Sequence, residues 1–481
     1  MKKMLLFLGL LGFSSAAYAQ GPWVEVNTTN PAAFPPGYSI SDVNAVNANL
    51  VWAVASEDSP QGVPNRFLVT NNATGTEFDF GAVVGAVVSG FQTANIAGIN
   101  ALTALAATHG DNMTGGGEIL RTTNGGQSWV KVSTASQFVA NQGGFCNFVH
   151  MFDANEGVSV GDPTNGYFEI LRTTDGGVTW TRIPSANIPA PFTGEAALVG
   201  SYFVRGNTMW FGGASTAAVQ ERVFKSVDRG VTWTVSTPTP LTENLTHIAF
   251  KDDLNGIAYN TKATGTVRTA ANYIRTTDGG ATWATFTPVN TTNGSFFLND
   301  IDAVNGVYYS AGPRFPQGAT QVAEDFGSSF STDGVNWTNM TISSGRRAGY
   351  FFSIDLIPGA TAGTTVGYGG LLTDGNGAGG VFKFSRTPTA TRNAELQREL
   401  SVYPNPSATG LFKVEFGGGL KAGAQLSVVD VLGRRVQAQT LTATTIGAKS
   451  INLDLSNEKV GVYTLQIRTD AGIATQKIVV E

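Results

Sequence analysis

The stretch LRTTDGGVTWTRI, residues 171–183, decides the fold because the chain repeats it. Near copies are LRTTNGGQSWVKV at residues 120–132 and IRTTDGGATWATF at residues 274–286. The tryptophan of this stretch recurs at intervals of 51, 53, 50 and 54 residues, at Trp129, Trp180, Trp233, Trp283 and Trp337. A repeat period near 50 residues is typical of the blades of a β-propeller.

A second element recurs between the tryptophans. It consists of an alternating apolar stretch, a short polar turn and a strand of small residues, as in NFVHMFDANEGVSVGDP from Asn147. Copies begin near Ser41, Asn95, Asn147, Ala197, Thr246, Leu298 and Tyr350. Alternation indicates half-buried strands, and four short strands per period make up a propeller blade. The sequence therefore predicts an all-β, seven-bladed β-propeller over residues 20–386.

The ends of this region predict how the ring closes. The last unit has the strand VFKFSR at residues 381–386 but no tryptophan after it. The N-terminal segment WVEV, residues 23–26, resembles the strand that follows each tryptophan box. We therefore expect residues 23–26 to pair with residues 381–385.

The repeated turn has a clear local chemistry. A short carboxylate such as that of Asp175 can accept backbone N–H groups of its own turn, and the following glycines permit positive φ. The tryptophan can bury its ring against the blade. The pattern S/T-x-D-x-G-x-T-W resembles the Asp boxes of sialidases, sortilin-type receptors, xyloglucan hydrolases and photosystem II assembly factors. The resemblance implies a structural hairpin away from any active site, formed by Asn124, Trp129, Asp175, Trp180, Asp228, Trp233, Asp278, Trp283, Asp333 and Trp337.

Composition and the N-terminus limit the class of protein. Charged residues make up 14% and the net charge is -5, with no Lys/Arg block, so we expect no nucleic-acid partner. Residues 1–19 have the basic, apolar and A-x-A parts of a signal peptide. The most apolar later run, residues 81–91, is too short to span a bilayer, so we expect no transmembrane segment. Cys146 is the only cysteine, which excludes an intramolecular disulfide.

The sequence pattern changes after residue 386. Residues 387–399 are predicted to be a linker, and residues 400–481 contain alternating strands spaced as in a small Ig-like β-sandwich. The segments YPNP (403–406), DVLGR (430–434), GVY (461–463) and KIVV (477–480) occur in that order. They resemble the C-terminal sorting domain of type IX secretion substrates. The resemblance implies that residues 400–481 engage the type IX secretion machinery and that the protein is secreted or held on the outer surface of a Gram-negative cell.

Catalytic motifs are weak. A sialidase would need three arginines, a Tyr–Glu pair, an Asp and an N-terminal F/Y-R-I-P motif, whereas TRIP at residues 181–184 lies after a box. Seven units also differ from the six blades of sialidases, and xyloglucan hydrolases have two propellers. The sequence therefore favours a non-enzymatic propeller that binds an extracellular glycan or protein. The alternative is a sialidase-like or xyloglucanase-like hydrolase with divergent catalytic residues.

Metal and cofactor signals are also weak, so we predict neither a metal site nor a cofactor. The three histidines, His109, His150 and His247, are scattered. Cys146 and His150 are expected on the same side of one strand, which gives only two ligands. DGNG at residues 374–377 lacks the later ligands of a calcium loop.

Blade topology predicts the binding face. We call the four consecutive antiparallel strands of each blade A to D. The A–B and C–D turns, with all the boxes, should lie on one face of the ring, and the longer B–C and D–A connections on the other. The longest, residues 313–328, carries Arg314 and Phe315, and the next D–A connection carries Arg346 and Arg347 before Tyr350. Forked guanidinium donors beside aromatic rings would suit an anionic or sugar ligand.

Overall fold

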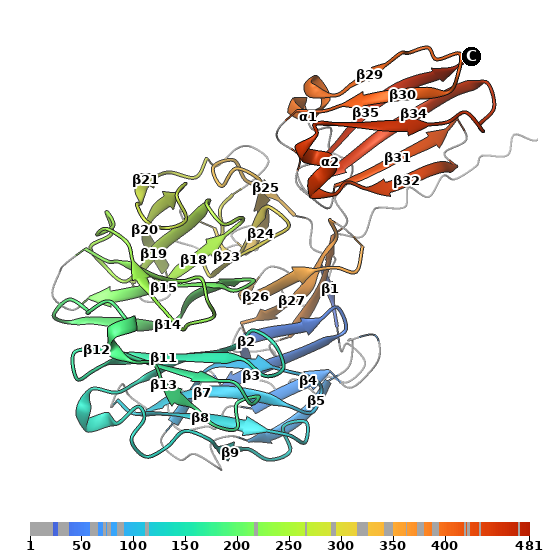
Figure 1. The fold of residues 1–481 in the computed structure, drawn as a ribbon. Coiled ribbons are helices and arrows are strands. Elements are labelled where there is room, and N and C mark those ends of the chain that lie inside the picture. Colours follow the sequence, from blue (N-terminus) through green and yellow to red (C-terminus); the bar gives the residue numbers. More distant parts are fainter. Residues whose placement is uncertain are drawn as a thin grey trace, which may run out of the picture.

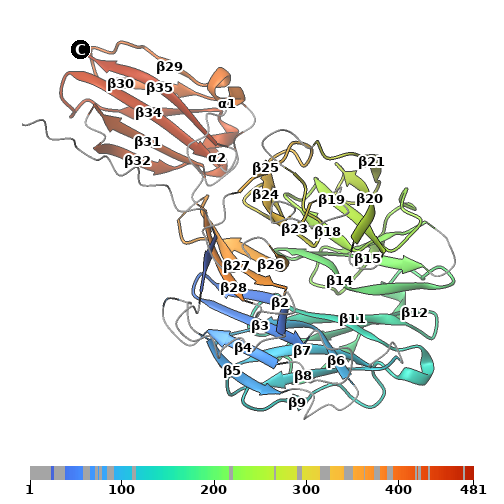
Figure 2. The same cartoon turned by 180° about the vertical axis from the view of Figure 1, so that it is seen from behind.

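A computed structural model describes most of the chain, and Figures 1 and 2 show it as two β-rich bodies. The residues described are 23–26, 38–57, 66–70, 74, 78–83, 91–110, 115–215, 220–264, 267–289, 295–314, 326–340, 350–361, 363–372, 380–386, 394–417, 420, 424–431, 434–469 and 472–481. The predicted signal peptide, residues 1–19, and the DGNG segment at residues 374–377 lie outside them.

Residues 23–386 contain seven four-stranded antiparallel sheets in the described part of the chain, as the sequence predicts. Blade 1 contains β2 (Tyr38–Asn47), β3 (Leu50–Glu57), β4 (Arg66–Thr70) and β5 (Phe78–Val83). Blade 2 contains β6 (Phe91–Gly98), β7 (Ala104–Gly110), β8 (Gly117–Thr122) and β9 (Val130–Lys131). Blade 3 contains β10 (Cys146–Met151), β11 (Gly157–Thr164), β12 (Tyr167–Thr173) and β13 (Thr181–Arg182). Blade 4 contains β14 (Glu195–Arg205), β15 (Thr208–Ser215), β16 (Val223–Ser226) and β17 (Thr234–Val235). Blade 5 contains β18 (His247–Phe250), β19 (Gly256–Thr264), β20 (Val267–Thr276) and β21 (Ala284–Phe286). Blade 6 contains β22 (Asp300–Val304), β23 (Val307–Pro313), β24 (Phe326–Ser331) and β25 (Thr338–Asn339). Short 3-10 helices cover Ala140–Gln142 and Ser185–Asn187.

Blade 7 closes the ring with a strand from each end of the propeller. It contains β26 (Phe351–Pro358), β27 (Thr365–Leu371), β28 (Val381–Arg386) and β1 (Trp23–Glu25), with β1 antiparallel to β28. Trp23 lies opposite Phe384, and the Val26 N–H donates to the Val381 carbonyl at 3.0 Å. The Trp23 ring is fully buried and its Nε1 donates to Ser328 Oγ at 2.8 Å. The predicted closure is therefore confirmed.

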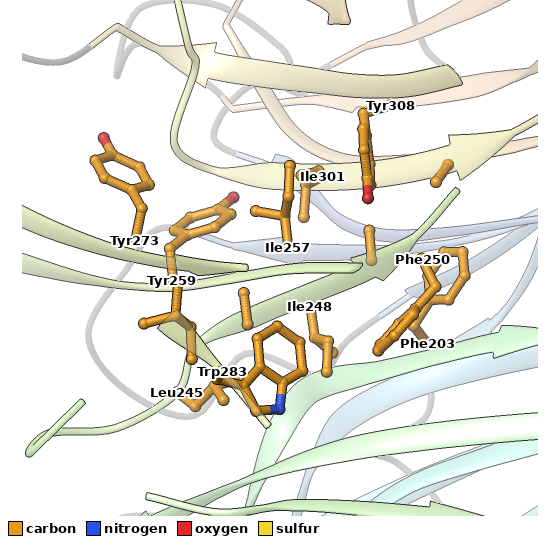
Figure 3. Packing of buried hydrophobic residues seen from close by; sticks show 14 of the residues in the cluster. Phe203, Leu245, Ile248, Phe250, Ile257, Tyr259, Tyr273, Trp283, Ile301 and Tyr308 are labelled. Atoms are coloured by element: carbon orange, nitrogen blue, oxygen red, sulfur yellow. The ribbon is translucent and has the colours of Figure 1, made fainter. Parts of the chain in front are cut away.

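Apolar side chains pack between neighbouring blades. The largest cluster joins blades 4, 5 and 6, and Figure 3 shows its centre around Phe250, Tyr259 and Trp283. Phe250 stacks on Trp210 of the preceding blade with ring centroids 3.9 Å apart. Burial of each such side chain contributes about 1.5–3 kcal/mol, so these contacts between blades are a main source of stability.

The C-terminal body has two packed sheets. Its elements are α1 (Ala394–Glu399), β29 (Ser401–Tyr403), β30 (Leu411–Glu415), β31 (Gln425–Asp430), β32 (Arg435–Thr440), α2 (Ala443–Gly447), β33 (Ser450–Asp454), β34 (Gly461–Thr469) and β35 (Gly472–Val480). The sheet orders are β29-β30-β33 and β32-β31-β34-β35. One apolar core, which includes Phe412, Leu426 and Ile467, lies within this body. The arrangement is compatible with the predicted Ig-like sandwich.

The end of the predicted linker differs from the expectation. Residues 394–399 form helix α1 rather than an irregular segment. Leu396 is buried in the apolar core of the C-terminal body, and Gln397 Nε2 donates to the Thr475 carbonyl at 2.9 Å. Apolar burial and this hydrogen bond therefore attach the helix to the C-terminal body. Among the described residues, no helix is long and apolar enough to cross a membrane.

Candidate functional site

Five hairpins carry the repeated turn, and we call them the box hairpins: residues 122–129, 173–180, 226–233, 276–283 and 331–337. In the second, Asp175 Oδ1 accepts the N–H groups of Val178 and Thr179 at 3.0 and 2.9 Å. Its Oδ2 accepts the Thr179 hydroxyl at 2.6 Å. Trp180 Nε1 donates to the Gly177 carbonyl at 3.2 Å, within the same turn. Each group that the sequence marks in this turn is therefore used inside the turn.

Asp228 and Asp278 make the same contacts with the threonine four residues later. Asp333 accepts the N–H and the Nδ2 of Asn336 instead, and Asn124 changes the pattern in another way. Asn124 Oδ1 accepts the Ser128 N–H at 3.0 Å, but its Nδ2 donates to Ser128 Oγ at 2.9 Å, where Asp175 accepts instead. Trp129 Nε1 is buried and has no hydrogen-bond partner, unlike the indole groups of the other four boxes. The first hairpin thus keeps its shape with fewer hydrogen bonds.

The box hairpins lie on one face of the ring, together with the A–B turns. The Gly176 N–H donates to the Asn155 carbonyl of the A–B turn in its own blade at 2.9 Å. Gly125 makes the equivalent bond to Leu102, and Gly279 to Leu254. The B–C and D–A connections of these blades therefore leave from the opposite face, which we call the long-loop face.

On the long-loop face, two of the predicted ligand-binding residues are described. Arg314 follows β23 and forms an isolated bridge with Phe297, and its side chain is half-buried. Tyr350 stacks on Phe326, the first residue of β24, with ring centroids 3.6 Å apart. Because Pro313 lies opposite Phe326, the stacked rings and Arg314 occupy one corner between blades 6 and 7. Phe315, Arg346 and Arg347 lie outside the described residues.

The first strands of the blades, around the axis of the ring, carry aspartates that sequence analysis did not single out. Asp42, Asp300, Asp302 and Asp355, the axial aspartates, come from blades 1, 6 and 7. Each accepts a backbone N–H from the next blade: Asp300 from Ile354 at 2.7 Å, Asp302 from Leu356 at 2.6 Å, Asp355 from Ala45 at 2.6 Å and Asp42 from Ile96 at 2.8 Å. These bonds tie together the blades on both sides of the ring closure.

Burial dominates the ionisation of the axial aspartates. Loss of water raises the pKa of Asp42 to about 7 and that of Asp302 to about 6, despite the hydrogen bonds that they accept. Burial and the Asp302 charge raise the pKa of Asp300 to about 8, and burial and the same charge raise the pKa of Asp355 well above its usual value. Burial and the repulsion between these carboxylates therefore both favour the protonated forms in the folded state.

Tyr202 extends toward the axial aspartates from blade 4. Its hydroxyl accepts a hydrogen bond from Asn95 Nδ2 of blade 2 at 3.0 Å, and its ring stacks on Phe148 of blade 3 at 4.2 Å. The Tyr202 pKa is raised by burial and by the charges of Asp42, Asp355 and Asp300. One tyrosine therefore links three blades near the axis.

Cys146 and His150 do not face the same side of β10, so that prediction is wrong. A bulge between Cys146 and Phe148 shifts the register by one residue and reverses the alternation. Cys146 packs with Val149 in one cluster, whereas His150 contacts Phe152 and Tyr202. Burial raises the Cys146 pKa to about 12 and lowers the His150 pKa to about 4. Within the described ranges, no three potential ligands group to hold a metal ion.

A weak sequence signal for the axial aspartates did exist. The donors Ile96, Ile354 and Leu356 each lie 54 residues after the aspartate that accepts from them. Carboxylates at alternate positions of an otherwise apolar first strand, as in NDIDAV from Asn299, therefore mark contacts between blades. Which of these groups come together was not predictable without the closed ring.

Comparisons with known proteins bear on the C-terminal body and the fold. Residues 401–481 match the family model of the secretion system C-terminal sorting domain. No curated protein sequence matches the chain significantly. A solved structure of PorZ, an essential bacterial surface component of the type-IX secretion system of Porphyromonas gingivalis, is similar at 15% identity and a TM-score of 0.44, and the match covers 92% of this chain but only 59% of PorZ.

Other solved structures show comparable similarity. YCF48 from Cyanidioschyzon merolae matches at 15% identity and a TM-score of 0.44, over 76% of this chain and 98% of YCF48. A Trypanosoma rangeli sialidase mutant with trans-sialidase activity matches at 11% identity and a TM-score of 0.38, over 92% of this chain and 83% of the sialidase. Such similarities do not assign a function. The strand pairing and the sorting-domain match identify the chain as a secreted or cell-surface seven-bladed β-propeller that ends in a member of the secretion system C-terminal sorting domain family.

Proposed function

We propose that the protein is a non-enzymatic binding propeller, exported by type IX secretion, that holds an extracellular glycan or protein on its long-loop face. In this proposal residues 1–19 are a signal peptide, residues 20–386 are the binding unit, residues 387–399 include the linker and residues 400–481 direct export. The sorting-domain match over residues 401–481 supports the export part.

The observation that carries the binding function is how the axial carboxylates are used. Both oxygens of Asp300 and of Asp302 accept backbone N–H groups, one from their own strand and one from the next blade. Asp355 Oδ2 accepts from both Ala45 and Asn44. A glycosidase needs one carboxyl group free to protonate the leaving group and another free to activate water or attack. The axial aspartates serve instead to connect blades.

The corner at blades 6 and 7 offers chemistry for a ligand. Arg314 supplies a guanidinium group, and the stacked rings of Phe326 and Tyr350 supply a half-buried apolar surface beside it. An arginine fork can pair with a carboxylate or with sugar hydroxyls, and the rings can cover an apolar face of the ligand. We place Arg346 and Arg347 in the same binding surface on the basis of the sequence.

The test compares three forms of the full chain on a glycan array and on cells. Arg314→Ala combined with Arg346→Ala should lower binding at least about tenfold, because two charge-assisted contacts are removed. Arg205→Ala is the matched control, since Arg205 ends β14 on the face of the ring that carries the box hairpins and pairs with Asp253 at 2.9 Å. Unchanged binding by the double variant with an intact fold would refute this site. Release of sugar from a bound glycan by the wild type would instead support the hydrolase alternative.

Export is tested separately. A chain that ends at residue 393, without α1 and the sorting domain, should keep the propeller but remain in the periplasm. Its appearance outside the cell at the wild-type level would contradict the assigned role of residues 400–481.

A further inference from the structure

Blade 4 carries a second polar group on the long-loop face, distinct from the corner at blades 6 and 7. It contains Glu195 at the start of β14, Glu221 and Arg222 before β16, and Phe192 in the preceding connection. Glu195 forms a two-pronged ion pair with Arg222 through Nε at 3.0 Å and through Nη2. Its Oε2 also accepts the Phe192 N–H at 2.8 Å. Glu195 is therefore fully occupied.

Glu221 is not fully occupied. Its Oε1 accepts the Ser215 N–H at 3.0 Å, but its buried Oε2 has no hydrogen-bond partner. The residue is 0% exposed, so an ionised carboxylate here would be costly. In blade 3, by contrast, Glu169 uses both of its carboxylate oxygens, toward Phe138 and Arg182. Among the described glutamates, Glu221 alone keeps a buried oxygen without a partner.

The charges at this position do not balance. The Arg222 guanidinium is already paired with Glu195, and among the described residues no ion pair involves Glu221. Burial and the Glu195 charge raise the pKa of Glu221 to about 7, so protonation of the Glu221 carboxyl group removes its charge when no ligand is bound. The group lies directly beneath the surface, since Gln220 is exposed and Phe192 is 40% exposed. Among the described residues, only the Ser215 N–H donates to the Glu221 carboxyl group, and binding of a ligand at Oε2 requires the side chain to rotate toward the surface.

We propose that Glu221 is the acceptor of a binding site for a primary ammonium group, which takes the place of the proton when it binds. The ammonium donates a charge-assisted hydrogen bond to Oε2, and the exposed Phe192 ring covers the adjoining methylene or sugar carbons. A lysine side chain and an amino sugar share this chemistry. The site goes beyond the proposed function, because its residues and its ligand charge differ from those at the Arg314 corner.

Proton exchange gives the site a pH signature. Below pH 7 the ligand must displace one proton from Glu221, so its affinity should rise about tenfold per pH unit. Above pH 8 Glu221 is ionised without the ligand, and the affinity should become constant until the amine itself loses its proton.

A substitution at Gly213 can block the site with a methyl group. A Cβ at this position would lie 3.5 Å from Glu221 Oε2, 3.5 Å from Glu195 Cγ and 3.4 Å from the Ala196 carbonyl. These are ordinary contacts, and the φ of Gly213 is not in the left-handed region, so alanine should be tolerated. Gly213→Ala should therefore fold normally and place a methyl group against the oxygen that the ammonium needs.

The experiment is calorimetric titration of the full chain with hexalysine and with chitosan hexamer, each compared with its N-acetylated form. We expect binding of at least one free amine, at least tenfold weaker binding of its acetylated form, and a similar loss in Glu221→Gln and Gly213→Ala. Glu118→Gln should bind like the wild type, since it removes one charge from an ion pair with Lys131 in blade 2. Binding of hexalysine alone would identify a lysine-bearing protein, and binding of chitosan alone an amino sugar.

Three results would overturn the proposal: no binding of either amine, equal binding of the acetylated forms, or unchanged binding by both Glu221→Gln and Gly213→Ala. The Arg314 and Arg346 double variant should bind amines normally. If the Arg314 and Arg346 double variant binds glycans like the wild type, the amine site at Glu221 is therefore unaffected. If no amine binds at Glu221, the proposed function of the long-loop face is likewise unaffected.

Discussion

The box hairpins and the axial strands both hold aspartates with backbone N–H groups, yet the pKa values of these aspartates shift in opposite directions. At the surface, partial desolvation acts against the shift, but hydrogen bonds from Thr179 and Thr173 lower the pKa of Asp175 to about 2. Inside the ring, burial raises the pKa of Asp300 to about 8, although it accepts two N–H groups. Hydrogen bonding to a carboxylate therefore decides its protonation only where water still solvates the charge.

The largest difference should appear when the carboxyl group is removed. Asp355→Ala leaves the buried Ala45 N–H and Asn44 Nδ2 without their acceptor. We expect the free energy of unfolding to fall by about 2–3 kcal/mol, because water cannot replace that acceptor. Urea denaturation at pH 6 measures it. A loss no larger than that of Asp175→Ala would contradict the comparison.

The pH dependence of stability should separate the two sets of aspartates. The raised pKa values of Asp42 and Asp300 mean that the folded state binds more protons than the unfolded state between about pH 4 and pH 8. The free energy of unfolding should therefore fall as pH rises through this window. Below pH 4 the box carboxylates, whose pKa values are lowered, become protonated, and stability should fall again.

Thermal unfolding from pH 3 to pH 9 follows both effects. Asp300→Asn is the control, because it removes one titrating group while keeping an oxygen for the Ile354 N–H. It should flatten the alkaline side of the curve and leave the acid side unchanged. A wild-type stability that rises steadily from pH 4 to pH 8 would show that the axial groups are ionised.

A smaller loss is expected from the exposed box. Asp175→Ala frees the N–H groups of Val178 and Thr179, which water can solvate, so the expected loss is about 1 kcal/mol. Denaturation of this variant at pH 6 allows direct comparison with Asp355→Ala. A loss above about 3 kcal/mol would mean that the hairpin nucleates its blade.

The smallest effect concerns the natural variant of the box. Asn124→Asp restores the acceptor that Asp175 offers to the hydroxyl four residues later, so stability should rise by a few tenths of a kcal/mol. This gain should be present at pH 6 and absent at pH 2. A gain that persists at pH 2 would show that the charge plays no part.

The fold was largely predictable because its signals are local and repeated. The tryptophan period gave the number of blades, and the missing outer strand after residues 381–386 indicated that residues 23–26 complete blade 7, which β1 does. Helix α1 was missed because a six-residue polar segment has no apolar period, and its position depends on burial of Leu396 in another part of the chain. The side of β10 that His150 faces was missed because a bulge leaves no mark in the sequence.

The sequence by itself determined the blades, the box turns, the ring closure and the sorting domain, since each depends on residue patterns within about one repeat. Only the tertiary structure decided which carboxyl groups keep their protons. Asp300 and Asp175 have the same side chain, yet their pKa values shift in opposite directions. Desolvation and the charges of distant residues set these pKa values, and both arise only when the ring has closed.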